Sequence, residues 1–214
     1  MKEDCIQIGL IDRNTLHRET LVYALTSQPD FRVAFSAASV NEVPAYGPPP
    51  HVMLFSAWYP SEVFGEELSM VYWRIRMPQT RLVLLTANTI RAVIEVLADQ
   101  AIDGFMIRQT VNTQTMFDIV RSAARGKQAF CPTTQAILAG PKTEKDLTRR
   151  EVQIIHRLHD VGIGNRKQVA HTLGVSTFTV NQHLKNIFEK LGVSGVAEVM
   201  ERGRAMGILE PTVT

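Results

Sequence analysis

The stretch HVMLFS, residues 51–56, decides how the first half of the chain folds. Its four consecutive apolar residues, Val52 to Phe55, are typical of a parallel strand that helices cover on both faces. Short apolar runs of the same kind recur at residues 5–11, 31–37, 81–86 and 103–107. The sequence therefore predicts five parallel strands.

Amphipathic segments separate these runs. The apolar residues that follow the first, fourth and fifth strands have helical spacing; they are Leu16, Leu21, Tyr23, Ala24 and Leu25, then Ile90, Val93, Ile94 and Leu97, then Met116, Ile119, Val120 and Ala123. After the second strand, NEVPAYGPPP (residues 41–50) leaves room for a short helix or none. The alternation predicts a doubly wound, flavodoxin-like (βα)5 domain with strand order 2-1-3-4-5.

Composition and charge set broad limits on the function. The 214 residues suffice for one large domain or two small ones, and the net charge is +2. Residues 143–214 hold 10 basic and 8 acidic side chains, which allows a nucleic-acid surface without requiring one. With no long apolar run, no signal-peptide pattern and two widely separated cysteines, we expect a cytoplasmic protein with free thiols and no membrane partner.

The second half of the chain has a different pattern. Residues 127–146 lose the periodicity and are predicted to link a domain of residues 1–126 to one of residues 147–214, with a short helix near residues 134–139. Four helical segments are expected near residues 148–158, 165–173, 176–190 and 194–206. Gly174 is predicted to end one helix and Ser176 to cap the next. This arrangement indicates a helix-turn-helix within an all-α four-helix domain.

Polar side chains stand at the predicted carboxyl ends of four strands, where doubly wound sheets collect their functional groups. They are Asp12, Arg13, Ser56, Thr86 and Arg108. Because these ends share one edge of the sheet, we expect the five side chains to form a pocket.

The motifs IGLIDRNTLHRETL, HVMLFSAWYP, RLVLLTA and DGFMIRQT resemble the receiver domain of bacterial two-component response regulators. With LTRRE and KQVAHTLGVSTFTVNQHLKNIFEKLGV, the whole chain resembles the NarL/FixJ (LuxR-type) subfamily. The resemblance implies two acidic residues that bind Mg²⁺ and an aspartate, at the end of the third strand, that a histidine kinase phosphorylates. It also implies a threonine or serine and a lysine that sense the phosphoryl group.

The sequence departs from that pattern at Arg13, Ser56 and Arg108, which replace the second acidic residue, the phosphoacceptor and the lysine. Asp12 alone is a poor Mg²⁺ site, and Ser56 is a weak nucleophile with no histidine expected beside it. We therefore predict a degenerate receiver that holds no metal or other cofactor. Either Arg13 or Arg108 pairs with Asp12, or the arginines bind an anionic ligand on which Trp58 and Tyr59 would stack.

The resemblance also implies that the second helix of the helix-turn-helix enters the major groove of double-stranded DNA. Asn181 and Gln182 are predicted to contact adenine, and Lys185 guanine or a phosphate. The residues expected to contact phosphates are Arg166, Lys167, Thr177 and Thr179. Two features depart from the family: Asn181 replaces a basic residue, and HDVGIGNRK (residues 159–167) is about two residues longer than usual.

These observations predict a bacterial transcription regulator, not an enzyme, controlled independently of aspartyl phosphorylation. It would act as a homodimer on two-fold-related promoter sites, with RNA polymerase or another regulator as a further partner. Residues that could carry a receiver dimer contact, or equally form a solvated face, are Arg91, Glu95, Asp118 and Arg121. Two alternatives remain open: a regulator that senses a small ligand in the cationic pocket, and one that sequesters a protein partner without binding DNA.

Overall fold

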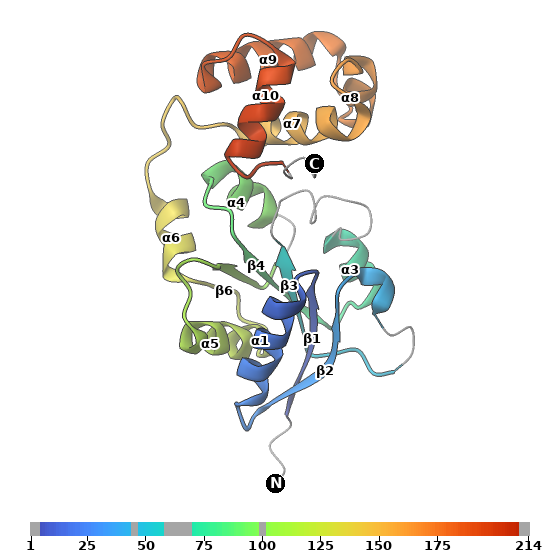
Figure 1. The fold of residues 1–214 in the computed structure, drawn as a ribbon, viewed down its shortest axis with the longest axis vertical. Helices are drawn as coiled ribbons and strands as arrows, with labels where there is room; N and C mark the ends of the chain where they lie inside the picture. The colour runs from blue at the N-terminus through green and yellow to red at the C-terminus, as the bar shows by residue number, and fades with distance from the viewer. Residues whose placement is uncertain (1–4, 44–46, 58–69, 99–101, 210–214) are drawn as a thin grey trace.

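The chain folds into an α/β domain followed by a helical domain, as Figure 1 shows. A computed structural model describes residues 5–43, 47–57, 70–98 and 102–209. In that part of the chain, no helix combines the length and the apolar character needed to cross a membrane. Trp58 and Tyr59, predicted to stack on a ligand, lie outside the described residues.

The α/β domain is built on a parallel sheet of six strands. These are β1 (Ile6–Asp12), β2 (Phe31–Ala37), β3 (Val52–Ala57), β4 (Arg81–Thr86), β5 (Gly104–Ile107) and β6 (Ala129–Phe130). Their order is β2-β1-β3-β4-β5-β6, which confirms the predicted order and adds one strand. The added strand has only two residues, paired with Gly104 and Phe105, and is too short to have a periodicity of its own.

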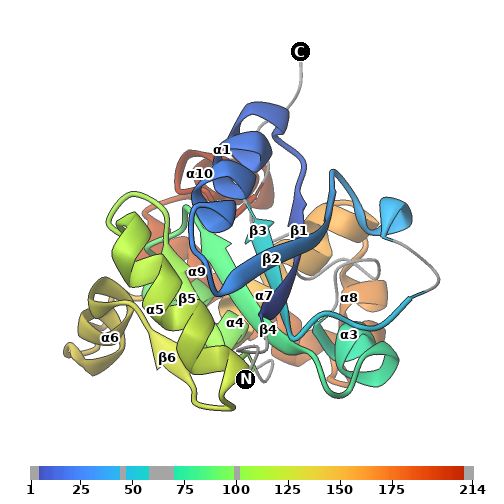
Figure 2. The ribbon, with the colours of Figure 1, turned by 90° about the horizontal axis from the view of Figure 1, so that it is seen from below.

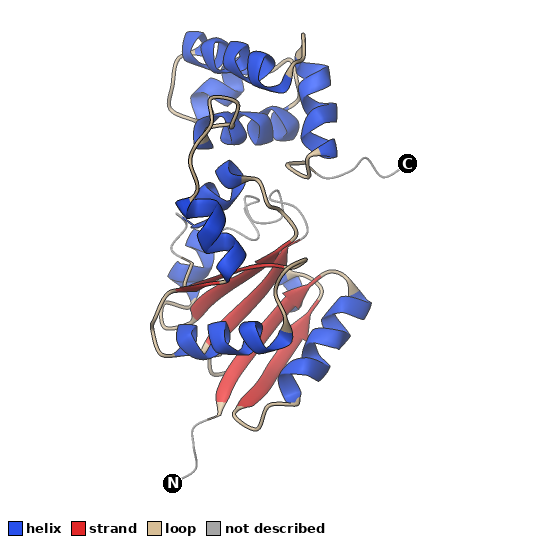
Figure 3. Ribbon diagram, turned by 90° about the vertical axis from the view of Figure 1, so that its left-hand side faces the viewer, coloured by secondary structure: helices blue, strands red, loops and turns tan. Residues whose placement is uncertain are grey.

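Helices cover both faces of the sheet. Helices α1 (Thr15–Thr26) and α5 (Thr113–Ala124) lie on one face, and α3 (Met70–Arg76) and α4 (Arg91–Ala98) lie on the other, as the views in Figures 2 and 3 show. Between β2 and β3 the described residues hold a 3₁₀ turn, η1 (Val40–Glu42), which agrees with the expectation of a short second helix or none.

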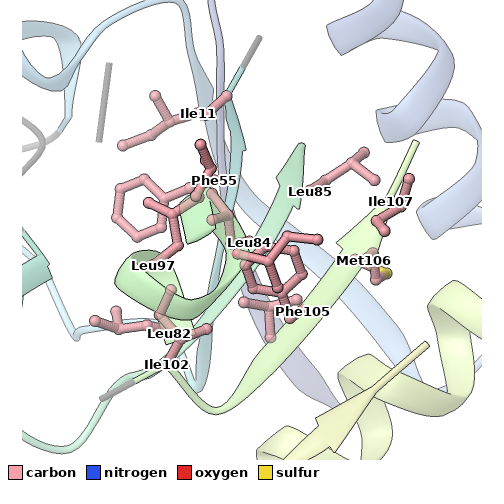
Figure 4. Close-up of a cluster of buried hydrophobic side chains, with 14 of the residues drawn as sticks. Ile11, Phe55, Leu82, Leu84, Leu85, Leu97, Ile102, Phe105, Met106 and Ile107 are labelled. Atoms are coloured by element: carbon pink, nitrogen blue, oxygen red, sulfur yellow. The ribbon is translucent and has the colours of Figure 1, made fainter. Parts of the chain in front are cut away.

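The core lies between the sheet and these helices, and Figure 4 shows part of it. The ring of Phe55 on β3 packs at 5.7 Å from that of Trp73, a fully buried residue of α3. In α1, Leu21 and Leu25 are buried as predicted, but Leu16 and Tyr23 are 75% and 80% exposed. Leu16 and Tyr23 therefore lie outside the buried side of α1, although their spacing suited an amphipathic helix.

The helical domain has the predicted four helices, preceded by α6 (Pro132–Ala139) between the domains. The four are α7 (Arg149–Val161), α8 (Arg166–Thr172), α9 (Thr177–Leu191) and α10 (Val196–Ala205). The Ser176 hydroxyl accepts a hydrogen bond from the Thr179 amide at 3.0 Å and caps α9 as expected. Gly192 ends α9 in the left-handed conformation, at φ 66°, which a residue without Cβ adopts easily.

The two domains contact each other through the α4 region, which packs against α6 and α7. The side-chain amide of Asn88, just before α4, donates a 2.8 Å hydrogen bond to the carbonyl of Gly207 after α10. Arg91 donates to the carbonyls of Leu138 and Gly140 at the end of α6. The face of the helical domain that carries α7 and α10 therefore lies toward the sheet, and α9 lies on the far side (Figure 1).

Candidate functional site

Asp12, Ser56, Thr86 and Arg108 meet at one edge of the sheet, as their positions at the strand ends predicted. Asp12 is paired in register with Ser56, and Thr86 is paired with both Ala57 and Ile107, the residue before Arg108. Asp12, Ser56 and Thr86 are all buried. The parallel register is therefore what brings together residues almost one hundred positions apart.

Arg108 connects the members of this pocket. Its Nη2 atom donates a hydrogen bond to Ser56 Oγ at 2.7 Å, and its Nη1 atom lies 3.9 Å from Asp12 Oδ2. Nη1 also lies 2.8 Å from Nε2 of His17. The guanidinium thus joins the hydroxyl at the end of β3 to the carboxylate at the end of β1.

His17 is a pocket residue that the sequence prediction missed. Its Nδ1 atom contacts Asp12 Oδ2, so a tautomer with the proton on Nδ1 donates to the carboxylate and leaves Nε2 to accept from Arg108. Asn14 caps α1 by accepting from the His17 amide at 2.9 Å, and this starts the helix early enough to bring His17 back over β1. The spacing Asp-x₄-His across a helix start was the available signal.

Of the two pocket arginines, Arg108 forms the ion pair with Asp12, while the side chain of Arg13 is exposed. The sequence left open which one would do so. Each arginine directly follows its strand, and it is the half-buried Arg108 whose guanidinium lies within ion-pair distance of Asp12. We expected no histidine beside Ser56 to act as its base; His17 shares the pocket but contacts Asp12 and Arg108, and Arg108 donates to Ser56.

These side chains do not suit Mg²⁺, the ion that the fold family implies. Mg²⁺ requires oxygen ligands in a near-octahedral shell, usually including one or two carboxylates. Asp12 is the carboxylate available here, and its Oδ1 accepts from the Asn14 amide at 2.8 Å while its Oδ2 faces His17 and Arg108. A guanidinium therefore lies within ion-pair distance of the atom that would bind the metal.

Thr86 connects the pocket to the interface between the domains. The amide of Asn88 donates to Thr86 Oγ1 at 3.2 Å, and the side chain of Asn88 donates to Gly207 of the helical domain. Asn88 itself is buried. One residue therefore separates the pocket hydroxyl from a contact with the helical domain.

A buried carboxylate, Glu95 on α4, anchors the same interface. It accepts hydrogen bonds from Arg91 at 2.9 Å, from Lys142 at 3.1 Å and from Arg149 of α7 at 3.3 Å. Burial alone would raise the pKa of Glu95, but the bonds from Lys142, Arg91 and Arg149 hold it at about 2. Glu95 is therefore an anion that cations from the linker and the helical domain neutralise.

This network changes the expectation of a receiver dimer contact. Arg91 and Glu95 are engaged within the chain, so they are not available as a solvated face or as a dimer contact in this arrangement. Arg121 pairs with Asp30 at 2.8 and 2.9 Å and lies over the Phe31 ring, 4.9 Å from its centroid. Asp118 is exposed. Most of the predicted contact therefore has intramolecular partners.

The helix-turn-helix presents a polar outer surface. Its exposed members are Arg166, Lys167, Asn181, Gln182 and Lys185, and Thr177 and Thr179 are half-buried. Arg166 on α8 donates to the side-chain oxygen of Asn181 on α9 at 2.9 Å, so the two helices share this surface. Val180, Leu184 and Ile187 are buried on the opposite side of α9. Burial of this stripe therefore leaves the polar side of α9 exposed, and α9 itself lies on the far side of the helical domain from the sheet (Figure 1).

Known proteins are similar to this chain in sequence and in fold. Residues 145–202 match the family model described as bacterial regulatory proteins, luxR family. The chain is 28% identical over 194 residues to the probable transcriptional regulatory protein SgaR of Hyphomicrobium methylovorum, covering 90% of this chain and 89% of that protein. It is also 28% identical over 204 residues to the uncharacterized transcriptional regulatory protein YxjL of Bacillus subtilis, covering 89% of this chain and 91% of the relative.

Solved structures agree on the fold. One is the structure of RcsB from Salmonella enterica serovar Typhimurium bound to promoter rprA, with a TM-score of 0.63 and 19% identity. The match covers 92% of this chain and 98% of RcsB. Residues 145–202 thus match the luxR family, and over most of its length the chain is similar in sequence and fold to response regulators of the NarL/FixJ type.

Proposed function

We propose that this protein is a transcription regulator that binds promoter DNA through α9. The observation that carries the proposal is the exposed polar side of α9, which bears Asn181, Gln182 and Lys185 on a helix that lies on the far side of the helical domain from the sheet (Figure 1). Two amide side chains and one cation on a helix of this length match the donors that read bases in the major groove. RcsB, a protein of the same fold, is described in complex with DNA.

The regulator is proposed to work in the cytoplasm as a homodimer on two-fold-related sites. One recognition helix buries little surface, so specific affinity generally requires two half-sites. A solved structure of RcsB is described as two dimers bound to two DNAs. We further propose that residues 1–126 form the receiver, residues 127–146 the linker and residues 147–214 the DNA-binding domain, with RNA polymerase or another regulator as partner.

The receiver is proposed to control DNA binding without aspartyl phosphorylation. Support comes from the pocket, where Arg108 bonds to Ser56 and pairs with Asp12. A serine cannot form an acyl phosphate, and the guanidinium takes over the neutralisation of Asp12. The same contacts argue against the ligand-sensing alternative, because Arg108 already has anionic and hydroxyl partners.

Replacing Lys185 with Ala is expected to weaken DNA binding about tenfold. Lys185 is exposed on the same side of α9 as Gln182 and would lose a contact to a base or a phosphate in each half-site. Fluorescence anisotropy with a promoter fragment at several salt concentrations measures the change. A lost phosphate contact lowers the slope of log affinity against log salt by about 1 for each site.

The matched control is Lys127→Ala, which removes another exposed lysine at the start of the linker, after α5. Its affinity and salt slope should equal those of the wild type. If the wild type bound no genomic fragment at low salt, DNA binding would be refuted in favour of the sequestering alternative. Equal affinities for Lys185→Ala and the wild type would contradict the role of α9.

Replacing Ser56 with Asp should not restore Mg²⁺-dependent phosphorylation. The new carboxylate would stand within bonding distance of Arg108, which donates to position 56 at 2.7 Å. Arg108 would then form an ion pair with the new carboxylate. The second acidic Mg²⁺ ligand of the family, which Arg13 replaces here, would still be missing. Incubation with a small phosphodonor and Mg²⁺, followed by intact-mass measurement, provides the test. An 80 Da adduct on the variant that depends on Mg²⁺ would contradict this account of the pocket.

A further inference from the structure

Phe178 is a large apolar side chain that the fold leaves in water. It is 71% exposed, and it lies in the first turn of α9, two residues after the capping Ser176. Every other large apolar residue of α9 is buried or half-buried. Packing within the chain therefore does not explain a phenylalanine at this position.

Helical spacing places Phe178 on the proposed DNA-reading side of α9. Residues four and seven positions later, Gln182 and Lys185, are its neighbours along the same face. Both are exposed, whereas Val180 and Leu184 point into the domain. Phe178 thus extends the row of base-reading candidates by one turn toward the N-terminus of the helix.

The chemistry of the row indicates DNA rather than an apolar protein surface as its partner. Phe178 is flanked by an amide and a cation, Gln182 and Lys185, and not by other exposed apolar residues of α9. The major groove offers one apolar group, the C5 methyl of thymine, among its hydrogen-bonding atoms and between the phosphates. An aromatic ring beside polar and cationic side chains complements that mixture.

We propose that Phe178 reads sequence by packing against a thymine methyl group in the major groove. The inference rests on the proposed DNA binding and adds to it a specificity residue and a base. The recognised half-site would contain a thymine next to the base pairs that Gln182 contacts. In this account, Phe178 contributes discrimination while Lys185 contributes general affinity.

Uracil substitution isolates the methyl group. A duplex selected in vitro with the full chain is resynthesised with each thymine replaced in turn by uracil, which removes the methyl and leaves base pairing unchanged. Wild-type affinity, measured by anisotropy, should fall about three- to fivefold for uracil at one position of each half-site. Phe178→Ala should bind the unmodified duplex with a similar loss and be insensitive to uracil at that position.

Two further variants complete the test. Phe178→Leu keeps an apolar side chain and should retain part of the sensitivity to uracil. Tyr23→Ala, which removes an aromatic side chain that is 80% exposed on α1, should behave as the wild type does. Because Phe178 is exposed, its replacement should leave the melting temperature unchanged, which separates lost recognition from lost folding.

The outcomes are distinct. If Phe178→Ala shows the same uracil loss as the wild type, or if no thymine position is sensitive in the wild type, the role of Phe178 is refuted while DNA binding stands. If the wild type selects no duplex at all, the proposed function fails, and this inference fails with it.

Discussion

Arg108→Ala is expected to lower the free energy of unfolding by about 3 kcal/mol, because removing one partner of a buried ion pair leaves the other uncompensated. The Asp12 carboxylate is fully buried, and the Arg108 guanidinium lies 3.9 Å from it. The same substitution removes the 2.7 Å hydrogen bond to Ser56. His17 and the Asn14 amide would remain as partners of Asp12, so the domain should still fold.

Urea unfolding monitored by circular dichroism measures the loss. Arg13→Ala is the matched control, since it removes an exposed arginine at the same edge of the sheet and should change stability by less than about 0.5 kcal/mol. The double variant Asp12→Asn with Arg108→Ala removes both charges and should recover part of the loss. Equal unfolding midpoints for Arg108→Ala and the wild type would show that Arg108 does not neutralise Asp12.

The fold was predictable because local patterns and global packing agree. The apolar run Val52–Phe55 has no polar side, so it suits only a strand buried on both faces, and β3 is fully buried. Ser176 and Gly174 mark the turn of the helix-turn-helix in the same way, by requirements of the backbone itself. Such signals depend on neighbouring residues in the sequence, so they can be recognised without knowing the tertiary contacts.

The pocket could be predicted only in part. The parallel strands determine where the backbone of Asp12, Ser56 and Arg108 lies, and their meeting follows from that. The backbone position does not determine where a long side chain ends, so the sequence could not decide whether Arg13 or Arg108 pairs with Asp12. His17 was missed because it belongs to a helix rather than to a strand end.

The interface between the domains could not be predicted from the sequence pattern. Glu95 sits on a helix whose apolar stripe is clear, and a charged residue there is ordinarily assigned to solvent. Its burial depends on Lys142 and Arg149, more than 45 positions away, which reach it only once α4 packs on α7. Tertiary contacts between charged groups have no sequence periodicity. The sequence therefore could not show whether Glu95 belongs to a dimer contact, a solvated face or an interface within the chain.

Glu95→Gln is expected to loosen the contact between the receiver and the helical domain. The neutral amide loses the ionic part of its bonds to Arg91, Lys142 and Arg149, of which Arg149 belongs to the helical domain. The pKa of Glu95 falls from 4.5 to about 2 on folding, which corresponds to about 3 kcal/mol. Because Lys142 and Arg149 are 64% and 47% exposed, solvent screening reduces the expected stability loss to roughly 2 kcal/mol.

The pH dependence has a defined sign. A carboxylate with a lowered pKa stabilises the folded state fully above the unfolded value of 4.5, and this contribution is lost as the pH falls toward about 2. The wild type should therefore lose interdomain stability over that range, whereas Glu95→Gln should start lower and show a smaller decrease. Glu19→Gln, at an exposed glutamate of α1, is the control and should keep the wild-type profile.

Small-angle scattering and limited proteolysis of the linker provide two measurements of the same interface. In Glu95→Gln at neutral pH the radius of gyration should increase and cleavage after Lys142 should accelerate, because that lysine is no longer held by a carboxylate. The intrinsic stability of each domain should hardly change, since the interface and not either core is affected. If the variant kept the scattering profile and the cleavage rate of the wild type, the Asn88–Gly207 bond and the packing of α4 on α7 would be sufficient to hold the domains together, and Glu95 would have no part in it.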